Sequence, residues 1–215
     1  DRGNHHLILL AKNKEGYHNL VKLVSYGFTE GFYYKPRIDK ELLRKHSAGL
    51  IVSSACLGGE IPQAIMNGDM AAAEQIALDF KEIFGDDYYL ELMLHKSGDF
   101  KIDEDVYENQ LKVNKAIIEL SKKTGIKCIA TNDVHFVLAE DAQAHDRLIC
   151  LNTGKDLDDK NRMRYTFQEY LKSEAEMLAN FPDFPEAIYN TEEIFNKVEY
   201  YSLSSKPIMP YFPLP

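Results

Sequence analysis

Four short runs of apolar residues constrain the fold of this chain more than any other feature. Each run is rich in β-branched, aromatic or leucine residues and nearly continuous in apolar character, which is typical of parallel strands covered on both faces. Helical patterns separate the runs, so the sequence predicts the α/β class, with a barrel or an open parallel sheet as candidates. The runs are HLILLA (6–11), GLIVSSA (49–55), YYLELML (88–94) and IKCIAT (126–131).

The segments between the runs have helical periodicity. Residues 69–84 repeat apolar side chains at three- and four-residue spacing, with Asp69 as the expected N-cap and Gly85 as the stop. Residues 106–123 show the same spacing and end at Gly125. Two further helices are expected at 15–26 and 39–46.

The pattern changes after about residue 150, so we expect one region over 1–150 and a second over 151–215. The second region opens with a polar loop and continues with two helices. The first of these helices begins with a capping box at Ser173, and the second has Pro185 at its first position. Residues 202–215 hold four of the chain's eight prolines, which suits an extended exit or linker.

Composition excludes several classes of protein. The net charge of −9 argues against a broad phosphate-binding surface, although it leaves open a local basic patch or a nucleic acid held by another domain. No apolar run is long enough to span a membrane, and no secretory signal is present. The three cysteines are widely spaced and odd in number, which favours a reducing cytoplasm. Because the chain starts at Asp1 beside a predicted buried element, we expect it to be part of a longer protein.

Candidate ligands follow two of the predicted strands. Asp133 and His135 come after the fourth run, two residues apart, so in an extended segment they point to the same side. Cys56 follows the second run, in front of two glycines. Carboxyl ends of parallel strands share one rim, and zinc accepts sulfur, nitrogen and oxygen ligands. An ordinary reading stays open, in which Cys56 is a small buried hydrophobe, Asp133 a cap and His135 a surface residue.

The other histidines are weaker candidates. His95 follows the third run and is a third possibility at the rim, whereas His145 lies in a predicted helix and is expected to be structural. The remaining ones are expected outside the site, with His18 and His46 on helix surfaces and His5 and His6 in front of a strand.

One further segment, EGFYYKPRID (30–39), combines aromatic and basic residues. Lys35 and Arg37 beside two tyrosines are candidates for weak nucleic-acid binding, by stacking on bases or clamping phosphates. Ordinary packing at an interface is the alternative.

Five blocks, in this order and at these separations, resemble the alpha subunit of the bacterial replicative (C-family) DNA polymerase III. The resemblance lies in its polymerase-and-histidinol-phosphatase (PHP) domain and runs from about residue 4 to the end of the chain. It implies that residues 1–150 are the C-terminal portion of a distorted (β/α)₇ PHP barrel. Residues 151–215 would be a helical and extended segment leading to the polymerase core. The blocks are HLILLAKNKEGYHNLVKL, GFYYKPRIDKELL, GLIVSSACLGGEIP, IKCIATNDVHF and TGKDLDD.

The resemblance also implies a metal site. Its late ligands match His6, Cys56, Asp133 and His135, none of them replaced, with His6 preferred to His5 because it directly precedes the apolar run. The family's early ligands, a His-x-His, an Asp, a His and a Glu, would precede Asp1. This portion is therefore expected to hold zinc or manganese in an incomplete site.

The function implied for the parent protein is DNA-directed DNA synthesis, a nucleotidyltransferase reaction with magnesium bound outside this chain. The PHP portion would support 3′–5′ exonuclease activity or a structural role. No catalytic residue is assignable here, and the chain alone is expected to be inactive. Implied partners are DNA, the proofreading exonuclease subunit and the sliding clamp of the replisome, in the cytoplasm and without a membrane. A non-catalytic scaffold for replisome subunits is the alternative, and a stand-alone PHP phosphoesterase is less favoured.

Overall fold

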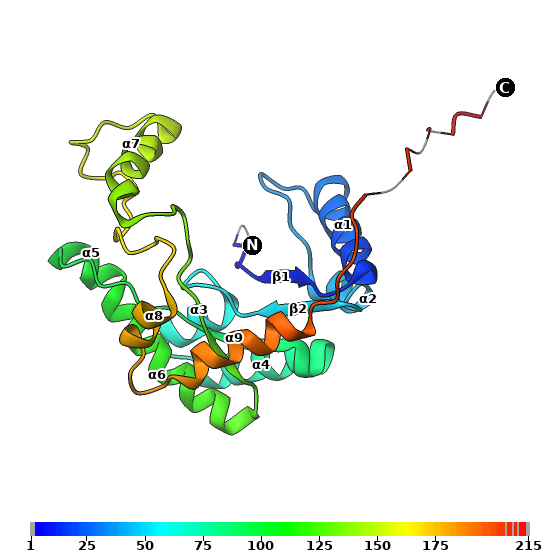
Figure 1. The fold of residues 1–215 in the computed structure, drawn as a ribbon, viewed down its shortest axis with the longest axis horizontal. Coiled ribbons are helices and arrows are strands. Elements are labelled where there is room, and N and C mark those ends of the chain that lie inside the picture. Colours follow the sequence, from blue (N-terminus) through cyan, green and yellow to red (C-terminus); the bar gives the residue numbers. More distant parts are fainter. Residues whose placement is uncertain (1–2, 205, 208, 210, 214–215) are drawn as a thin grey trace.

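A four-stranded sheet forms the centre of the computed structural model, which describes residues 3–204, 206, 207, 209 and 211–213 (Figure 1). Each predicted run forms a strand, and the sheet order is β1-β2-β3-β4. Every residue of β2, β3 and β4 is buried, as continuous apolar runs predict, whereas β1 alternates between exposed and half-buried residues at one edge. The strands are β1 (Ile8–Ala11), β2 (Leu50–Ser53), β3 (Tyr88–Leu92) and β4 (Cys128–Ala130).

The direction of β1 corrects the prediction of a parallel sheet. β1 is antiparallel to β2, whereas β2, β3 and β4 are mutually parallel. The connection between β1 and β2 contains α1 (Lys14–Thr29), a loop and α2 (Lys40–Lys45), and it returns the chain to the end of the sheet where β1 finished. There the Lys12 amide donates to the Gly49 carbonyl, at 2.9 Å. A connection that returns to the same end of the sheet makes the two strands antiparallel, and one that reaches the opposite end makes them parallel. The spacing of apolar runs does not distinguish these two cases, so it could not predict the direction of β1.

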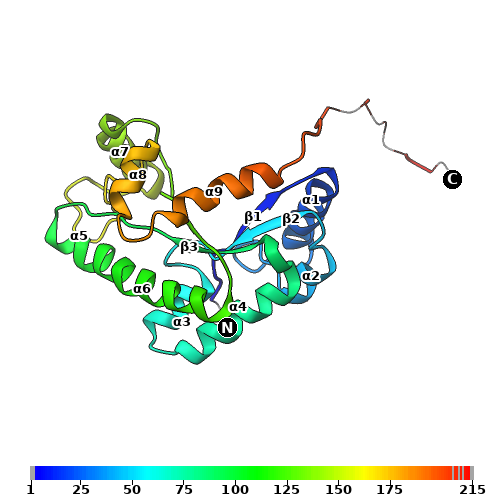
Figure 2. The same ribbon diagram turned by 60° about the horizontal axis from the view of Figure 1, so that its bottom comes forward.

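Helices cover both faces of the sheet (Figure 2). On one face α3 (Glu60–Met66), α4 (Met70–Phe84) and α6 (Tyr107–Thr124) enclose the main core. On the other face α9 (Glu186–Lys197) places Ile194 against the smaller cluster of Ile51, Tyr89 and Ile129. Asn190 of α9 also donates to the Cys128 carbonyl of β4, at 2.8 Å.

The predicted caps at Asp69, Gly125 and Ser173 are confirmed, whereas α1 continues to Thr29, past its expected end at residue 26. Asp69 caps α4 by accepting from the Ala72 amide at 2.9 Å, and Gly125 ends α6 in the left-handed conformation. Ser173 opens α8 (Glu174–Asn180) with the expected capping box, and Pro185 directly precedes α9. Periodicity did not predict the short helices α3 and α5 (Phe100–Asp105). Two 3₁₀ turns occupy Gly85–Asp87 and Ala139–Asp141.

One predicted surface residue is buried. His46 follows α2 and is only 9% exposed, with its ring stacked on Tyr26 at a centroid distance of 5.8 Å. The surface prediction was wrong because a short helix ends here against α1, and periodicity over six residues does not show such a contact. His18 is exposed, as expected.

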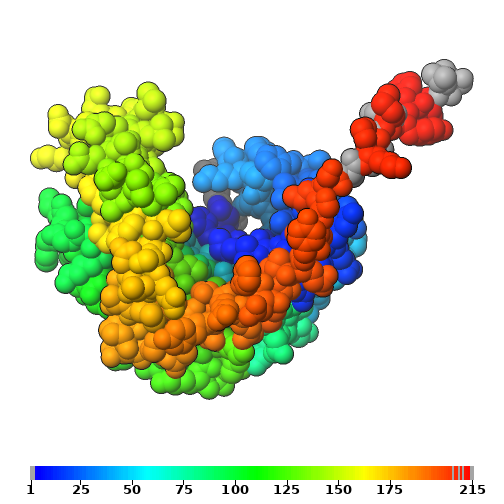
Figure 3. All heavy atoms as spheres, viewed as in Figure 1, coloured from blue at the N-terminus to red at the C-terminus, as the bar shows by residue number. Residues whose placement is uncertain are grey.

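Beyond the sheet, α7 (Ala142–Thr153) and the loop after it form an arm. Figure 3 shows a broad notch between this arm and the side of the molecule formed by α1, with β1 at its floor. The predicted proline-rich exit has no helix or strand in its described residues and leads away from the sheet (Figure 1). Positions 205, 208, 210, 214 and 215 of that prediction lie outside the described residues. Among described residues, no helix has the length and apolar character needed to cross a membrane.

Candidate metal site

The candidate ligands come together on one rim of the sheet. β2, β3 and β4 are parallel, so their carboxyl ends share this rim and lead to Cys56, His95 and Asp133 respectively. The amino end of β1 lies on the same rim because β1 is antiparallel. His6, which precedes β1, therefore reaches the rim. The argument that excluded residues in front of a strand assumed parallel strands, and it fails for this reason.

His6 and Cys56 form the first pair. The His6 Nδ1 atom lies 3.4 Å from Cys56 Sγ, and the His6 amide donates to the Gly58 carbonyl at 2.9 Å. A Cβ atom on Gly58 would lie 3.1 Å from His6 Nδ1, so a glycine leaves the imidazole the room it needs. Burial raises the pKa of the Cys56 thiol, and the negative charge of Asp133 raises it further.

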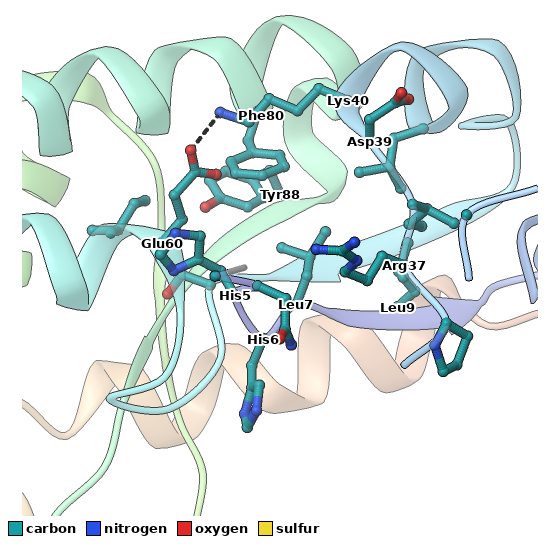
Figure 4. Close-up of a pocket in the computed structure, with 18 residues that line it drawn as sticks. His5, His6, Leu7, Leu9, Arg37, Asp39, Lys40, Glu60, Phe80 and Tyr88 are labelled. Carbon is teal, nitrogen blue, oxygen red and sulfur yellow. Dashed lines mark hydrogen bonds and ion pairs between the residues drawn. The ribbon is translucent and has the colours of Figure 1, made fainter. Parts of the chain in front are cut away.

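Figure 4 shows that the two adjacent histidines point to opposite sides of the strand. His5 points toward Glu60, in a cleft of about 640 Å³ that also holds the ion pair between Lys40 and Glu60, at 2.9 Å. His6 points to the other side, toward Cys56. The geometry therefore favours His6 over His5 as the partner of Cys56.

Asp133 and His135 form the second pair. The His135 Nε2 atom lies 3.6 Å from an Asp133 carboxylate oxygen, and both side chains are exposed. Asp133 has a φ angle of +43°, so the segment is not extended as the sequence argument assumed. The two side chains nevertheless meet. The turn at Asp133 brings them together, and not the extended backbone in which residues two apart point to the same side.

Two rings that the sequence analysis did not assign to the site surround His135. Tyr165 lies at a centroid distance of 4.5 Å and His145 at 5.7 Å. Burial raises the pKa of Tyr165, and the charges of Asp133 and Glu169 raise it further. Tyr165 belongs to the polar loop, which had no periodicity to reveal it, and His145 of α7 was expected to be structural.

His95 lies below the rim in a buried polar network. It is 3% exposed, and its Nε2 atom lies 3.2 Å from both the backbone and the side-chain oxygen of Asn132. Burial lowers the pKa of His95, and the charge of Glu169 opposes that effect. Glu169 accepts from the Thr166 hydroxyl at 2.6 Å, and its backbone carbonyl accepts from the His135 amide at 2.8 Å. The network holds the loop that carries Asp133 and His135 against the segment after α7.

The donor atoms of both pairs fit a metal ion such as zinc. Two ligands of one tetrahedral zinc ion, bound at about 2.0 to 2.3 Å, lie about 3.3 to 3.7 Å apart. The separations of 3.4 Å at Cys56 and 3.6 Å at Asp133 match this spacing. Across the part of the chain that the structure describes, no three His, Cys, Asp or Glu side chains form one metal-binding group. The rim therefore presents two separate pairs of candidate ligands.

The aromatic and basic segment lies on the surface between α1 and α2. Arg37 lies over the Tyr33 ring at 5.0 Å, and Tyr33 meets Tyr34 edge-on at a centroid distance of 4.7 Å. Tyr34 is 75% exposed, and Lys35 is exposed as well. Exposed rings beside basic groups are compatible with base stacking.

Comparisons with known proteins give the chain its relatives. The PHP domain family model matches residues 1–95. The DNA polymerase III subunit alpha of Borreliella burgdorferi is 43% identical over 214 residues, which cover 99% of this chain and 18% of that protein. The subunits of Helicobacter pylori and Thermus aquaticus are 43% and 40% identical over 203 and 225 residues, covering 89% and 100% of this chain. These cover 16% and 17% of those two proteins, so the chain spans less than a fifth of each of these relatives.

Proposed function

This chain is a PHP-domain portion of the DNA polymerase III alpha subunit family, and from that premise we propose that its rim is part of a metal site for phosphodiester hydrolysis. The observation that carries the proposal is the meeting of His6 with Cys56 at 3.4 Å, on the rim where Asp133 meets His135 at 3.6 Å. The metal would be zinc or manganese. The remaining ligands would come from residues that precede this segment in the full-length protein.

The fold proposed for the full domain is the distorted (β/α)₇ barrel. The chain would supply its C-terminal strands, and additional strands would extend the sheet beyond the present edges. The half-exposed side chains of Ile8 (43%) and Leu10 (44%) on β1 support this, because an edge strand with exposed apolar residues is suited to cover by further structure.

The proposed chemistry is 3′–5′ exonuclease cleavage. A bound metal ion would supply an activated water and stabilise the charge that develops on the phosphate. His6, Cys56, Asp133 and His135 would bind the ion, while Tyr165 would border the position of the scissile group. No general base is assigned.

The full-length protein is proposed to be a DNA-directed DNA polymerase. Its magnesium site would lie outside this chain, after the proline-rich segment. Its partners would be DNA, the proofreading exonuclease subunit and the sliding clamp, in the cytoplasm. The chain alone is proposed to be inactive both as a polymerase and as a nuclease, because its ligand pairs are separate and the polymerase carboxylates are not part of it.

Lys35 and Arg37 are proposed as a weak contact with single-stranded DNA beside the metal site. Support comes from the exposed Tyr34 ring and from the guanidinium of Arg37, which lies over the Tyr33 ring. Replacing both basic residues with alanine should weaken binding of a single-stranded oligonucleotide by about tenfold at low salt, with a smaller effect at high salt. Unchanged affinity at low salt would remove this contact from the proposal.

A non-catalytic scaffold is the second candidate. The observation that favours it is the lack, among described residues, of a group of three metal-binding side chains. In that case the rim would fix the position of the PHP domain beside other replisome subunits without binding a catalytic ion.

The test compares ligand variants of the full-length protein. Asp133→Ala and His135→Ala should each lower bound zinc or manganese and reduce release of 3′ nucleotides by more than about 100-fold, since direct ligands matter more than their supporting residues. Primer extension should persist. His18→Ala, an exposed histidine on α1, is the matched control. Normal metal content and nuclease activity in both ligand variants would reject the catalytic proposal and leave the scaffold.

A further inference from the structure

A buried carboxylate on β3 joins the two strand ends that carry the candidate ligands. Glu91 is 5% exposed and lies in the middle of the sheet. One of its oxygens accepts from the Ser53 hydroxyl at 2.6 Å and from the Ala55 amide at 3.0 Å. The other accepts from the Thr131 hydroxyl at 2.5 Å. A single side chain thus receives donors from β2 and from the end of β4, on either side of its own strand.

The positions of these donors connect Glu91 to the site. Ala55 directly precedes Cys56, and Thr131 lies two residues before Asp133. Ala55 also has a φ angle of +63°, a conformation that costs a non-glycine residue about 1 to 2 kcal/mol. The bond from its amide to Glu91 helps to hold that conformation and thereby the direction in which Cys56 leaves β2.

A carboxylate is costly at this depth. A buried charge needs several donors to offset its lost hydration, and an apolar side chain would fill the same volume without that requirement. Sheet stability alone therefore gives little reason for a glutamate here. Its three donors come from the segments that lead into the two ligand pairs.

We propose that Glu91 is a positioning residue that fixes the distance between the Cys56 and Asp133 sides of the rim. The inference rests on the proposed metal site for its purpose. The physical claim is that one carboxylate fixes the positions of the loops that carry Cys56 and Asp133. This claim rests on the hydrogen bonds and can be tested without a metal. β3 supplies none of the proposed ligands, so its role would be to hold in register the strand ends on either side of it.

The first arm of the test uses the 215-residue chain without metal. Glu91→Gln keeps the shape of the side chain but replaces one acceptor with a donor, so the backbone amide resonances of Cys56 and Asp133 should both shift in ¹H–¹⁵N spectra. Tyr89→Phe is the matched control, because it removes a buried hydroxyl from the same strand at the opposite rim. It should leave both resonances in place. Unchanged resonances in Glu91→Gln would overturn the proposal.

Two further variants, each removing one hydrogen-bond donor to Glu91, cover the case in which Glu91→Gln does not fold. Thr131→Val removes only the donor on the β4 side and should move the Asp133 resonance. Ser53→Ala removes only a donor on the β2 side and should move the Cys56 resonance. If neither variant moves its expected resonance, the proposal fails.

The second arm measures binding of Co²⁺ alone to the full-length protein, in which the proposed site would be complete. The absorption band of Co²⁺ with a thiolate reports on Cys56. Glu91→Gln should weaken Co²⁺ binding by about 10- to 100-fold, as for other residues that orient metal ligands, whereas Tyr89→Phe should leave it unchanged. Equal affinity in wild type and Glu91→Gln would overturn the positioning role. A full-length wild type with no thiolate band would count against the proposed metal site itself, and the amide resonances of the 215-residue chain would then decide the role of Glu91 independently.

Discussion

The two rims of the sheet use polar residues in opposite ways. At the rim where β1 ends and β3 and β4 begin, the charged side chains are paired with each other. At the candidate metal rim the polar groups form two separate pairs and the backbone is strained. The difference indicates which rim holds the sheet together and which is free to bind a ligand.

The charged rim is a closed network. Lys197 of α9 contacts Asp87 at 3.2 Å and Glu193 at 3.3 Å, and its amino group also donates to the Tyr89 hydroxyl at 2.7 Å. Lys12 pairs with Asp87, and Lys127 pairs with Glu193. The network connects the end of β1, the starts of β3 and β4, and α9. We therefore expect it to attach α9 to the sheet.

The candidate rim has the strain that the charged rim lacks. Ala55 and Asp133 adopt positive φ angles of +63° and +43°. Asp133 is itself a candidate ligand, and Ala55 directly precedes Cys56. Such conformations persist where the surrounding structure enforces them, and they concentrate at functional sites. The strain therefore supports a binding role for this rim independently of its ligand types.

The largest effect expected from this comparison comes from breaking the charged rim. Lys197→Met removes the ion pairs of Lys197 with Asp87 and Glu193 and its hydrogen bond to Tyr89, although Lys12 still pairs with Asp87. It should lower the free energy of unfolding by about 2 kcal/mol in urea titrations. Lys22→Met, at an exposed position on α1, is the control and should change it by less than about 0.5 kcal/mol. A loss at Lys197 no larger than at Lys22 would show that the network does not attach α9.

A smaller effect should depend on pH. The hydrogen bond from Lys127 lowers the pKa of Glu193 from its ordinary 4.5 to about 2. A lowered pKa means that Glu193 stabilises the fold fully above about pH 4.5 and that this contribution is lost as the pH falls toward 2. Glu193→Gln should therefore be less stable than wild type by about 1 kcal/mol at pH 7, after allowance for solvent screening, with the difference shrinking toward pH 3.

Glu192→Gln, on the exposed neighbour, is the control for the pH effect and should show no such trend. A difference between wild type and Glu193→Gln that stays constant from pH 7 to pH 3 would mean that Glu193 is not held ionised by Lys127. Thermal unfolding at several pH values measures both variants.

The smallest effect should have the opposite sign, and it sharpens the contrast between the rims. Asp133→Gly relieves a positive φ angle at an exposed position, so it should raise the free energy of unfolding by about 0.5 kcal/mol while removing a proposed ligand. Asp141→Gly, at a φ angle of −75°, should lower it instead. A loss of stability at position 133 as large as at position 141 would show that the rim is not strained there.

Local sequence signals determined much of the secondary structure. The four apolar runs form the four strands, and the caps at Asp69, Gly125 and Ser173 act where they were predicted. Periodicity and capping depend on residues a few positions apart, so they can be read without knowing the rest of the fold. The same reasoning placed Cys56, Asp133 and His135 after strands.

Contacts between distant segments decided the rest. The direction of β1 follows from how α1, α2 and their loop pack, and it brings His6 to the rim. The three donors around Glu91 likewise come from residues 36 to 40 positions away in the sequence. Sequence determined which residues follow each strand, because that is a local property. Only the tertiary structure decided which of them face each other, because strand direction and burial are set by packing across the whole sheet.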